Sequence, residues 1–148
     1  MKNRFPFNVK IRWHLILVHF PISFFGAAFL FQILHIIFTP TSGCFTLGTS
    51  VLIGTGAVAM VPTVISGWTT RAHKYHGAST PLFKKKIYTA FIILGLSVPL
   101  LVWRLIIFSV LVDEPYSWEH WILLLGTTLL ITGAIIEGYY GGKLNHHD

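Results

Sequence analysis

Long apolar stretches separated by short polar segments dominate the pattern of this chain. Four stretches, at about 13–38, 45–68, 87–112 and 119–141, reach the roughly 20 residues that a helix needs to cross a bilayer. The segments between them contain Pro40, Pro81 and Pro115, as expected for residues that end helices. The pattern therefore predicts four transmembrane helices.

Short connections make neighbouring helices antiparallel, so the predicted fold is all-α, an integral membrane, up-and-down four-helix bundle in one domain over residues 1–148. Pro62 and Pro99 lie inside two of the stretches, and each predicts a kink. Small residues on the second and fourth stretches either permit close helix contact or leave space for a flat cofactor. These small residues are Ser50, Gly54, Ala57, Gly138 and Gly142.

Composition supports this assignment, because 53% of the residues are apolar and only 11% are charged. Mean hydropathy is +0.67. The basic beginning of the chain resembles that of a signal peptide, but the apolar run after it is too long and no cleavage site follows, so we expect a retained first span. The single cysteine, Cys44, excludes an intramolecular disulfide, and the lack of C-x-x-C-H excludes covalently attached haem.

Charge predicts the orientation in the membrane. Ten of the eleven Lys and Arg residues lie before the first stretch, between the second and third, or after the fourth, and these segments share one face. The opposite face carries Asp113, Glu114 and Glu119. The positive-inside rule then places both termini in the cytoplasm, and we expect a multi-pass protein of the cell inner membrane. Its surroundings would be membrane lipid, and no nucleic-acid partner is expected.

Histidines at the ends of the stretches are the main candidates for chemistry. His19 lies about six residues inside the first stretch, roughly 9 Å from the cytoplasmic end, and His73 and His76 follow the second stretch on that side. His35 and His120 lie at the opposite face. Two imidazoles from facing helices can hold haem iron, so we expect one or two b-type haems. The cytoplasmic iron ligands would be His19 with His73 or His76, and the outer ligands His35 with His120.

Other interpretations remain open for most of these histidines. His35 and His120 could be ordinary interfacial side chains beside Trp118 and Trp121. His14 could cap the first helix or extend its side chain to the membrane boundary. His76, His146 and His147 could simply be solvated. The strongest single candidate is His19. Zinc-ligand spacing, nucleophile–base arrangements and phosphate loops are absent from the sequence, so hydrolytic chemistry is not expected.

Two charges lie within the apolar stretches. Arg104, in the outer half of the third stretch, would hold a haem propionate or an acidic partner, or extend to Asp113 or Glu114. Glu137, near the cytoplasmic end of the fourth, would relay a proton for quinone chemistry or pair with Lys or Arg at the boundary. Their opposite depths argue against a direct Arg104–Glu137 pair.

Residues 14–22, HLILVHFPI, resemble the opening H-P-x-x-V-H-F-P-I of the membrane family called domain of unknown function 2231, with Leu15 in place of proline. Ser66-Gly67-Trp68 and residues 138–146, GYYGGKLNH, are similar to later parts of that family. The resemblance implies a small four-helix membrane protein in a redox setting, with His14, His19 and His146 as its shared histidines. It favours a single cytoplasmic haem as much as two haems.

The sequence therefore favours a b-type cytochrome subunit that passes electrons between a redox partner and the quinone pool. So small a chain would act as an electron-transfer subunit of an oxidoreductase complex rather than as a stand-alone enzyme. Two alternatives are a cofactor-free membrane anchor or assembly subunit, and a small metal-ion or proton transporter that uses the same histidines.

Overall fold

The computed structural model describes residues 7–38, 42–74, 81–107 and 118–145, which form four long helices. Helix α1 spans Phe7–Ile37, α2 spans Ser42–Lys74, α3 spans Pro81–Ile107 and α4 spans Trp118–Asn145. All four are long and apolar enough to cross a membrane. The predicted all-α class is confirmed, and the structure is that of a multi-pass membrane protein.

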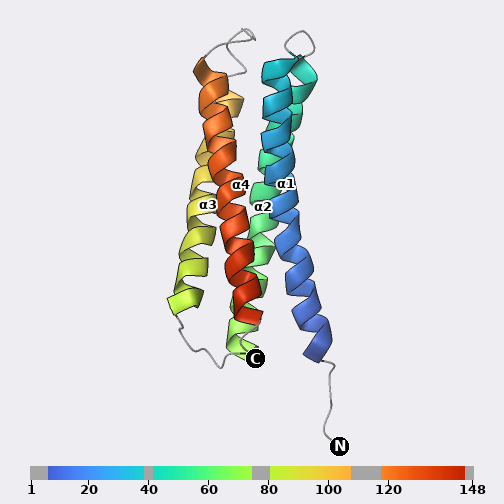
Figure 1. Cartoon of the computed structure of the whole chain (residues 1–148), viewed down its shortest axis with the longest axis vertical. Coiled ribbons are helices and arrows are strands. Elements are labelled where there is room, and N and C mark those ends of the chain that lie inside the picture. Colours follow the sequence, from blue (N-terminus) through green and yellow to red (C-terminus); the bar gives the residue numbers. More distant parts are fainter. Residues whose placement is uncertain (1–6, 39–41, 75–80, 108–117, 146–148) are drawn as a thin grey trace, which may run out of the picture.

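The helices form an up-and-down bundle in which each is antiparallel to its neighbours (Figure 1). Helix α1 packs against α2 and α4, and α3 packs against the same two helices. The start of α1 and the end of α4 therefore lie at one end of the bundle, together with the end of α2 and the start of α3. We call this the basic end, because Lys74, Lys84, Lys85 and Lys143 belong to it, and we call the other the far end.

The helices extend beyond the apolar stretches at the basic end. Helix α3 begins at Pro81 rather than at about residue 87, so Lys84, Lys85 and Lys86, which we expected in a loop, are helical. Proline is favoured at the first helical position because its missing N–H would have no partner there. Hydropathy thus located the membrane-crossing part of the helix and missed its polar first turns.

Polar and apolar side chains are distributed as expected for a protein in lipid. Large apolar side chains cover the outside, among them Val58, which is 71% exposed, and Ile92, which is 68% exposed. Buried hydroxyl side chains bond to carbonyls of their own helix. Thr49 Oγ1 donates to the Phe45 carbonyl at 2.9 Å, and Thr127 Oγ1 donates to that of Leu123 at 3.0 Å. Their polar groups are therefore satisfied without water.

Prolines lie within three helices, at Pro21 in α1, Pro62 in α2 and Pro99 in α3. A proline has no N–H, so the carbonyl four residues earlier loses its helical hydrogen bond. For Pro21 that carbonyl belongs to Leu17, and Thr63 Oγ1 of α2 lies 3.0 Å from it and shares its hydrogen between it and the Ala59 carbonyl of α2, which is 2.8 Å away. This bond repairs the break in α1 and fixes the register of α1 against α2. The kinks expected at Pro62 and Pro99 stay predictions.

Exposed aromatic side chains form a girdle near each end of the bundle. Trp118 and Trp121 lie at the far end, and Trp68, Tyr88 and Tyr139 lie near the basic end. Along α4, Trp118 and Tyr139 are separated by roughly 31 Å, which matches the hydrocarbon thickness of a bilayer. Trp and Tyr favour membrane interfaces, so the girdles mark where the bilayer surfaces meet the protein.

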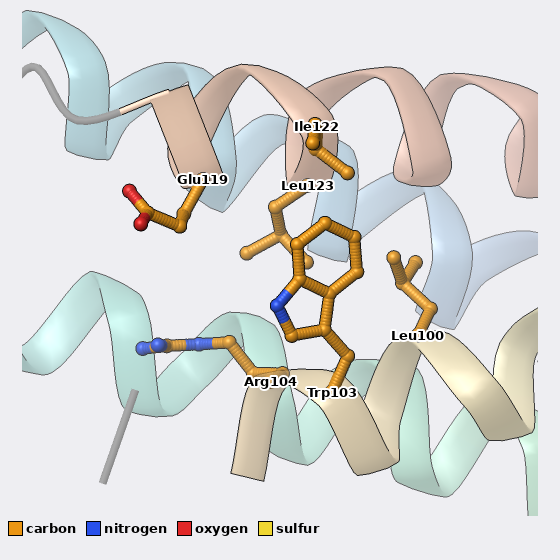
Figure 2. Close-up of a pocket in the computed structure, with 6 residues that line it drawn as sticks. All are labelled: Leu100, Trp103, Arg104, Glu119, Ile122 and Leu123. Carbon is orange, nitrogen blue, oxygen red and sulfur yellow. The ribbon is translucent and has the colours of Figure 1, made fainter. Parts of the chain in front are cut away.

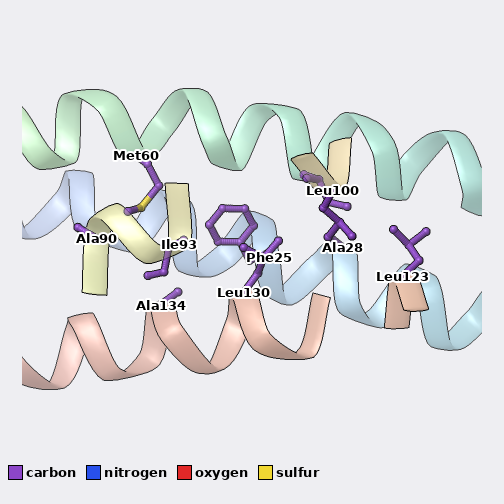
Figure 3. Packing of buried hydrophobic residues seen from close by; sticks show 10 residues of the cluster. Phe25, Ala28, Met60, Ala90, Ile93, Leu100, Leu123, Leu130 and Ala134 are labelled. Carbon is purple, nitrogen blue, oxygen red and sulfur yellow. The ribbon is translucent and has the colours of Figure 1, made fainter. Parts of the chain in front are cut away.

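The core between the girdles is closely packed by side chains of all four helices (Figure 3). Phe25 of α1 is fully buried there with Met60, Ile93 and Leu130. Gly56 of α2 makes room for Phe25, because a Cβ at Gly56 would lie 2.6–3.0 Å from three atoms of its ring. This glycine permits close contact between α1 and α2.

Gly56→Ala should therefore destabilise the bundle by about 1–3 kcal/mol, because a buried aromatic ring has little freedom to move aside. Reversible unfolding in mixed detergent micelles, followed by circular dichroism, measures the change. Gly95→Ala is the matched control, since a Cβ there meets no atom within 4 Å. Equal stability of the two variants would contradict the packing described here.

Candidate functional site

Two histidines that are far apart in the sequence meet inside the far end of the bundle. His35 lies in the last turn of α1 and His120 in the first turn of α4, and they are 0% and 1% exposed. Their Nε2 atoms are 3.2 Å apart, and their rings lie 4.1 Å apart at an angle of 39°. One ring must donate its Nε2 hydrogen to the Nε2 of the other. The sequence predicted both residues as candidate ligands at this end, and the structure shows that their rings are in direct contact.

Gln32 is the third member of this group. It lies three residues before His35, on the same face of α1, and is 0% exposed. Its Nε2 donates a 3.1 Å hydrogen bond to the main-chain carbonyl of His120, while its Oε1 is buried and accepts no hydrogen bond. Gln32 was not among the residues predicted from the sequence, although its spacing of three residues from His35 places both side chains on one face of a helix.

A second polar group lies on the other side of α4 at the same end. Consecutive residues of a helix point about 100° apart, so His120 faces α1 while Glu119 faces α3. Figure 2 shows Glu119 and Arg104 of α3 extending toward the same side of a small pocket lined by Trp103. Arg104 is 7% exposed and Glu119 is 9% exposed. Arg104 therefore has an acidic neighbour within the bundle, whereas Asp113 and Glu114 lie outside the described residues.

A third polar group, Lys86 of α3 and Glu137 of α4, is buried near the basic end. The side chains are 7% and 4% exposed, and their opposite charges attract each other. Gly141 lets Lys86 approach, since a Cβ there would lie 3.3 Å from Nζ. Lys86 is thus a basic residue close enough to Glu137 to interact with it, while both the expected pairing of Glu137 at the boundary and the proton relay stay predictions. Lys86 itself was expected in a loop.

His19, the strongest candidate from the sequence, lies on the outside of the bundle. Its side chain is exposed and lines a shallow hollow with Ile16, Phe20 and Ser23, all from α1. It therefore faces away from the other described helices. The side chain of His14 is not described, and His76, His146 and His147 lie outside the described residues.

The helix register separates His19 from His73. Thr63 of α2 lies level with Leu17 of α1 because the two residues share a hydrogen bond. His73 lies ten residues beyond Thr63 toward the basic end, and His19 lies two residues beyond Leu17 in the opposite direction. Their backbones are thus roughly 18 Å apart along the bundle axis, which is too far for two ligands of one iron. The predicted His19–His73 pair is therefore corrected, and His19 with His76 stays a prediction.

The far-end pair has the right donors for haem but the wrong spacing. With iron–imidazole bonds of about 2 Å, two axial Nε2 atoms lie about 4 Å apart on opposite faces of a flat ring. The Nε2 atoms of His35 and His120 are 3.2 Å apart and their rings are in contact. In this arrangement the pair does not hold a porphyrin between its rings.

The small residues that might have left space for a cofactor mostly contact other helices. A Cβ at Gly54 would lie 3.5 Å from Leu101, and one at Gly138 would lie 3.1 Å from Ile22. Ser50 and Ala57 are each 8% exposed. Only Gly142 of this set faces open space. The helix-contact interpretation is therefore supported for Gly54 and Gly138, and it stays a prediction for Ser50 and Ala57.

No protein-family model, curated protein or solved structure matches this chain. The resemblance to the domain of unknown function 2231 family thus stays a prediction. Within residues 7–38, 42–74, 81–107 and 118–145, no group of three or more His, Cys, Asp or Glu residues could hold a metal ion.

The His35–His120 bond should show energetic coupling. Because each single replacement by leucine leaves the other imidazole buried without its partner ring, each should cost about 1–3 kcal/mol of unfolding free energy. The double variant His35→Leu/His120→Leu should cost less than the sum, with a coupling energy of about 0.5–3 kcal/mol. A double-mutant cycle in detergent measures this coupling, and strictly additive costs would contradict the bond.

Proposed function

We propose that this chain is a membrane-embedded electron-transfer subunit that holds a b-type haem through His19, at a surface completed by a partner subunit. The observation that carries the proposal is the exposed imidazole of His19 in an apolar hollow at membrane depth. The haem would exchange electrons between a redox partner and the quinone pool. The proposal makes the chain a component of an oxidoreductase complex.

The depth of His19 argues for a partner rather than lipid at this surface. The residue lies in the span Ile16–Ile37, and Ser23, one turn further into the bilayer, is exposed as well. Polar side chains that face outward within a membrane are costly and are usually functional. A helix of another subunit that covered the hollow would remove His19 from lipid and could supply the second axial ligand.

The packing inside the bundle supports a haem at the surface. His35 and His120 are in direct contact, and Phe25, Ile93 and Leu100 fill the space beside Gly56, Gly133 and Gly126. The chain's own contribution would be one imidazole and the apolar walls formed by Ile16 and Phe20. When bound, haem supplies a one-electron redox centre whose potential depends on axial ligands and on the polarity of its surroundings.

The basic residues support an orientation with both termini in the cytoplasm, in the cell inner membrane. Of the Lys and Arg residues that the structure describes, all except Arg104 lie at the end where α1 begins and α4 ends. Basic segments are retained on the cytoplasmic side during insertion. The proposed haem at His19 would then lie near the cytoplasmic surface.

A second candidate function is a cofactor-free anchor or assembly subunit. The observation that favours it is the internal pairing of charged and polar groups, such as Lys86 with Glu137 and His35 with His120. A bundle in which these groups contact one another needs no cofactor to bring its helices together. The spectrum described next separates the two candidates.

Protein purified with its complex from haem-replete cells should show a Soret band and a b-type α band on reduction with dithionite. His19→Ala should remove both bands, because the proposed haem then lacks its ligand from this chain. His35→Gln should keep them, since it changes only the internal pair. A complex without haem would refute the cytochrome assignment, and loss of haem in His35→Gln alone would move the site to the far end.

Reporter fusions test the proposed orientation. A fluorescent protein fused after Asp148 should fluoresce, and alkaline phosphatase fused at the same position should be inactive, because this end is proposed to be cytoplasmic. Phosphatase inserted at Pro40, in the segment between α1 and α2, should be active. The opposite pattern at both positions would reverse the orientation and would place His19 near the outer surface.

A further inference from the structure

We propose that His35, His120 and Gln32 form a binding site for a single transition-metal ion of the zinc class, between α1 and α4 at the far end of the bundle. The site is independent of the proposed haem at His19. It uses two imidazole nitrogens and one amide oxygen, all from side chains that are at least 99% buried. Imidazole and oxygen ligands suit zinc and related divalent ions.

The spacing of the two histidines distinguishes a bare ion from haem. Two imidazole ligands of a tetrahedral ion, with metal–nitrogen bonds of 2.0–2.1 Å or so, have their nitrogens about 3.3–3.4 Å apart. The observed Nε2–Nε2 distance of 3.2 Å is close to this value. A metal ion also requires the ring centroids, which are 4.1 Å apart, to separate to about 5 Å, so the two rings must move apart by about 1 Å and turn their Nε2 atoms toward the ion. A porphyrin requires a still wider gap.

Gln32 supplies the third ligand. Its amide is held beside His120 by the 3.1 Å bond from Nε2 to the His120 carbonyl, and its Oε1 is buried with no hydrogen-bond donor. An amide oxygen with both lone pairs available in a dry interior gains a partner by binding a cation. The fourth position of a tetrahedral site would be filled by water or an incoming ligand, as in zinc sites that are not purely structural.

Metal binding replaces the hydrogen bond between the rings. In the metal-free state one ring carries its hydrogen on Nε2 and donates it to the other ring. In the bound state both Nε2 atoms hold the ion, so this hydrogen moves to Nδ1 of the same ring and no proton is lost. Glu119, one residue before His120, contributes negative charge to this layer, and Arg104 contributes positive charge from α3.

The test uses the full chain in detergent with His146→Ala and His147→Ala as background, since adjacent histidines can chelate metal themselves. It is made in cells without added haem, so that the result does not depend on the haem proposal. Co²⁺ should bind with one ion per chain and show the intense d–d bands of a four-coordinate site. Zn²⁺ should displace it.

Each of His35→Gln and His120→Gln should weaken Zn²⁺ binding by about 100-fold or more, and Gln32→Leu by about 10-fold. The matched control is Thr127→Ala, which removes a buried polar group two turns along α4 and should leave the affinity unchanged. Zn²⁺ should also raise the unfolding temperature of the background protein and not that of His35→Gln, because an ion that binds only the folded state stabilises it.

Binding of less than one ion per chain, Co²⁺ bands of a six-coordinate site, or an affinity unchanged in His35→Gln would overturn the proposal. The two histidines would then serve only as a hydrogen bond between helices. If His35→Gln fails to fold, the proposed metal site can still be tested. The dependence of the unfolding temperature on Zn²⁺ in Gln32→Leu and in the background protein then decides it.

Discussion

The shortage of hydrogen-bond partners for polar groups in lipid is the constraint on which this structure depends. Helices in lipid satisfy their own main chain, but a proline, an imidazole or a charged side chain within the span requires a partner from another helix. Thr63 donates to the carbonyl of Leu17 that Pro21 leaves without a helical bond. His35 meets His120 near one membrane surface, and Lys86 attracts Glu137 near the other. These contacts fix how α1, α2, α3 and α4 are placed along one another, while apolar packing fills the space between them.

The same constraint separates the histidines into an internal pair and an outward-facing residue. His35 and His120 have turned inward and contact each other, so this chain alone can account for their burial. His19 lies at the opposite depth and faces outward beside Ile16 and Phe20. An outward imidazole inside the span points to something beyond the bundle. The proposed redox function therefore depends on a partner subunit, whereas the proposed metal site depends only on α1 and α4.

Sequence patterns predicted the membrane class, the four helices and the placement of His35 and His120 at the same end of the bundle, although as two ligands of a haem iron rather than in direct contact. Hydropathy carries this information because the bilayer fixes the length of an apolar stretch. The patterns missed the helical state of Lys84 and Lys86, since polar helical turns look like loops on a hydropathy scale. They also could not show that His19 faces outward or that His73 lies too far along the axis. Both facts depend on helix rotation and register, which these helices, apolar on all sides, do not encode in their periodicity.

The contact between His35 and His120 is the claim on which the account of the bundle depends, and solid-state NMR in lipid bilayers tests it directly. With ¹⁵N-labelled histidine, the account predicts a ¹⁵N–¹⁵N correlation between the Nε2 atoms of the two rings, which lie 3.2 Å apart. This correlation should vanish in His120→Gln, and its loss would assign the signal to the His35–His120 pair. Two histidines with no such correlation and with rapid exchange of their ring hydrogens with water would contradict the account.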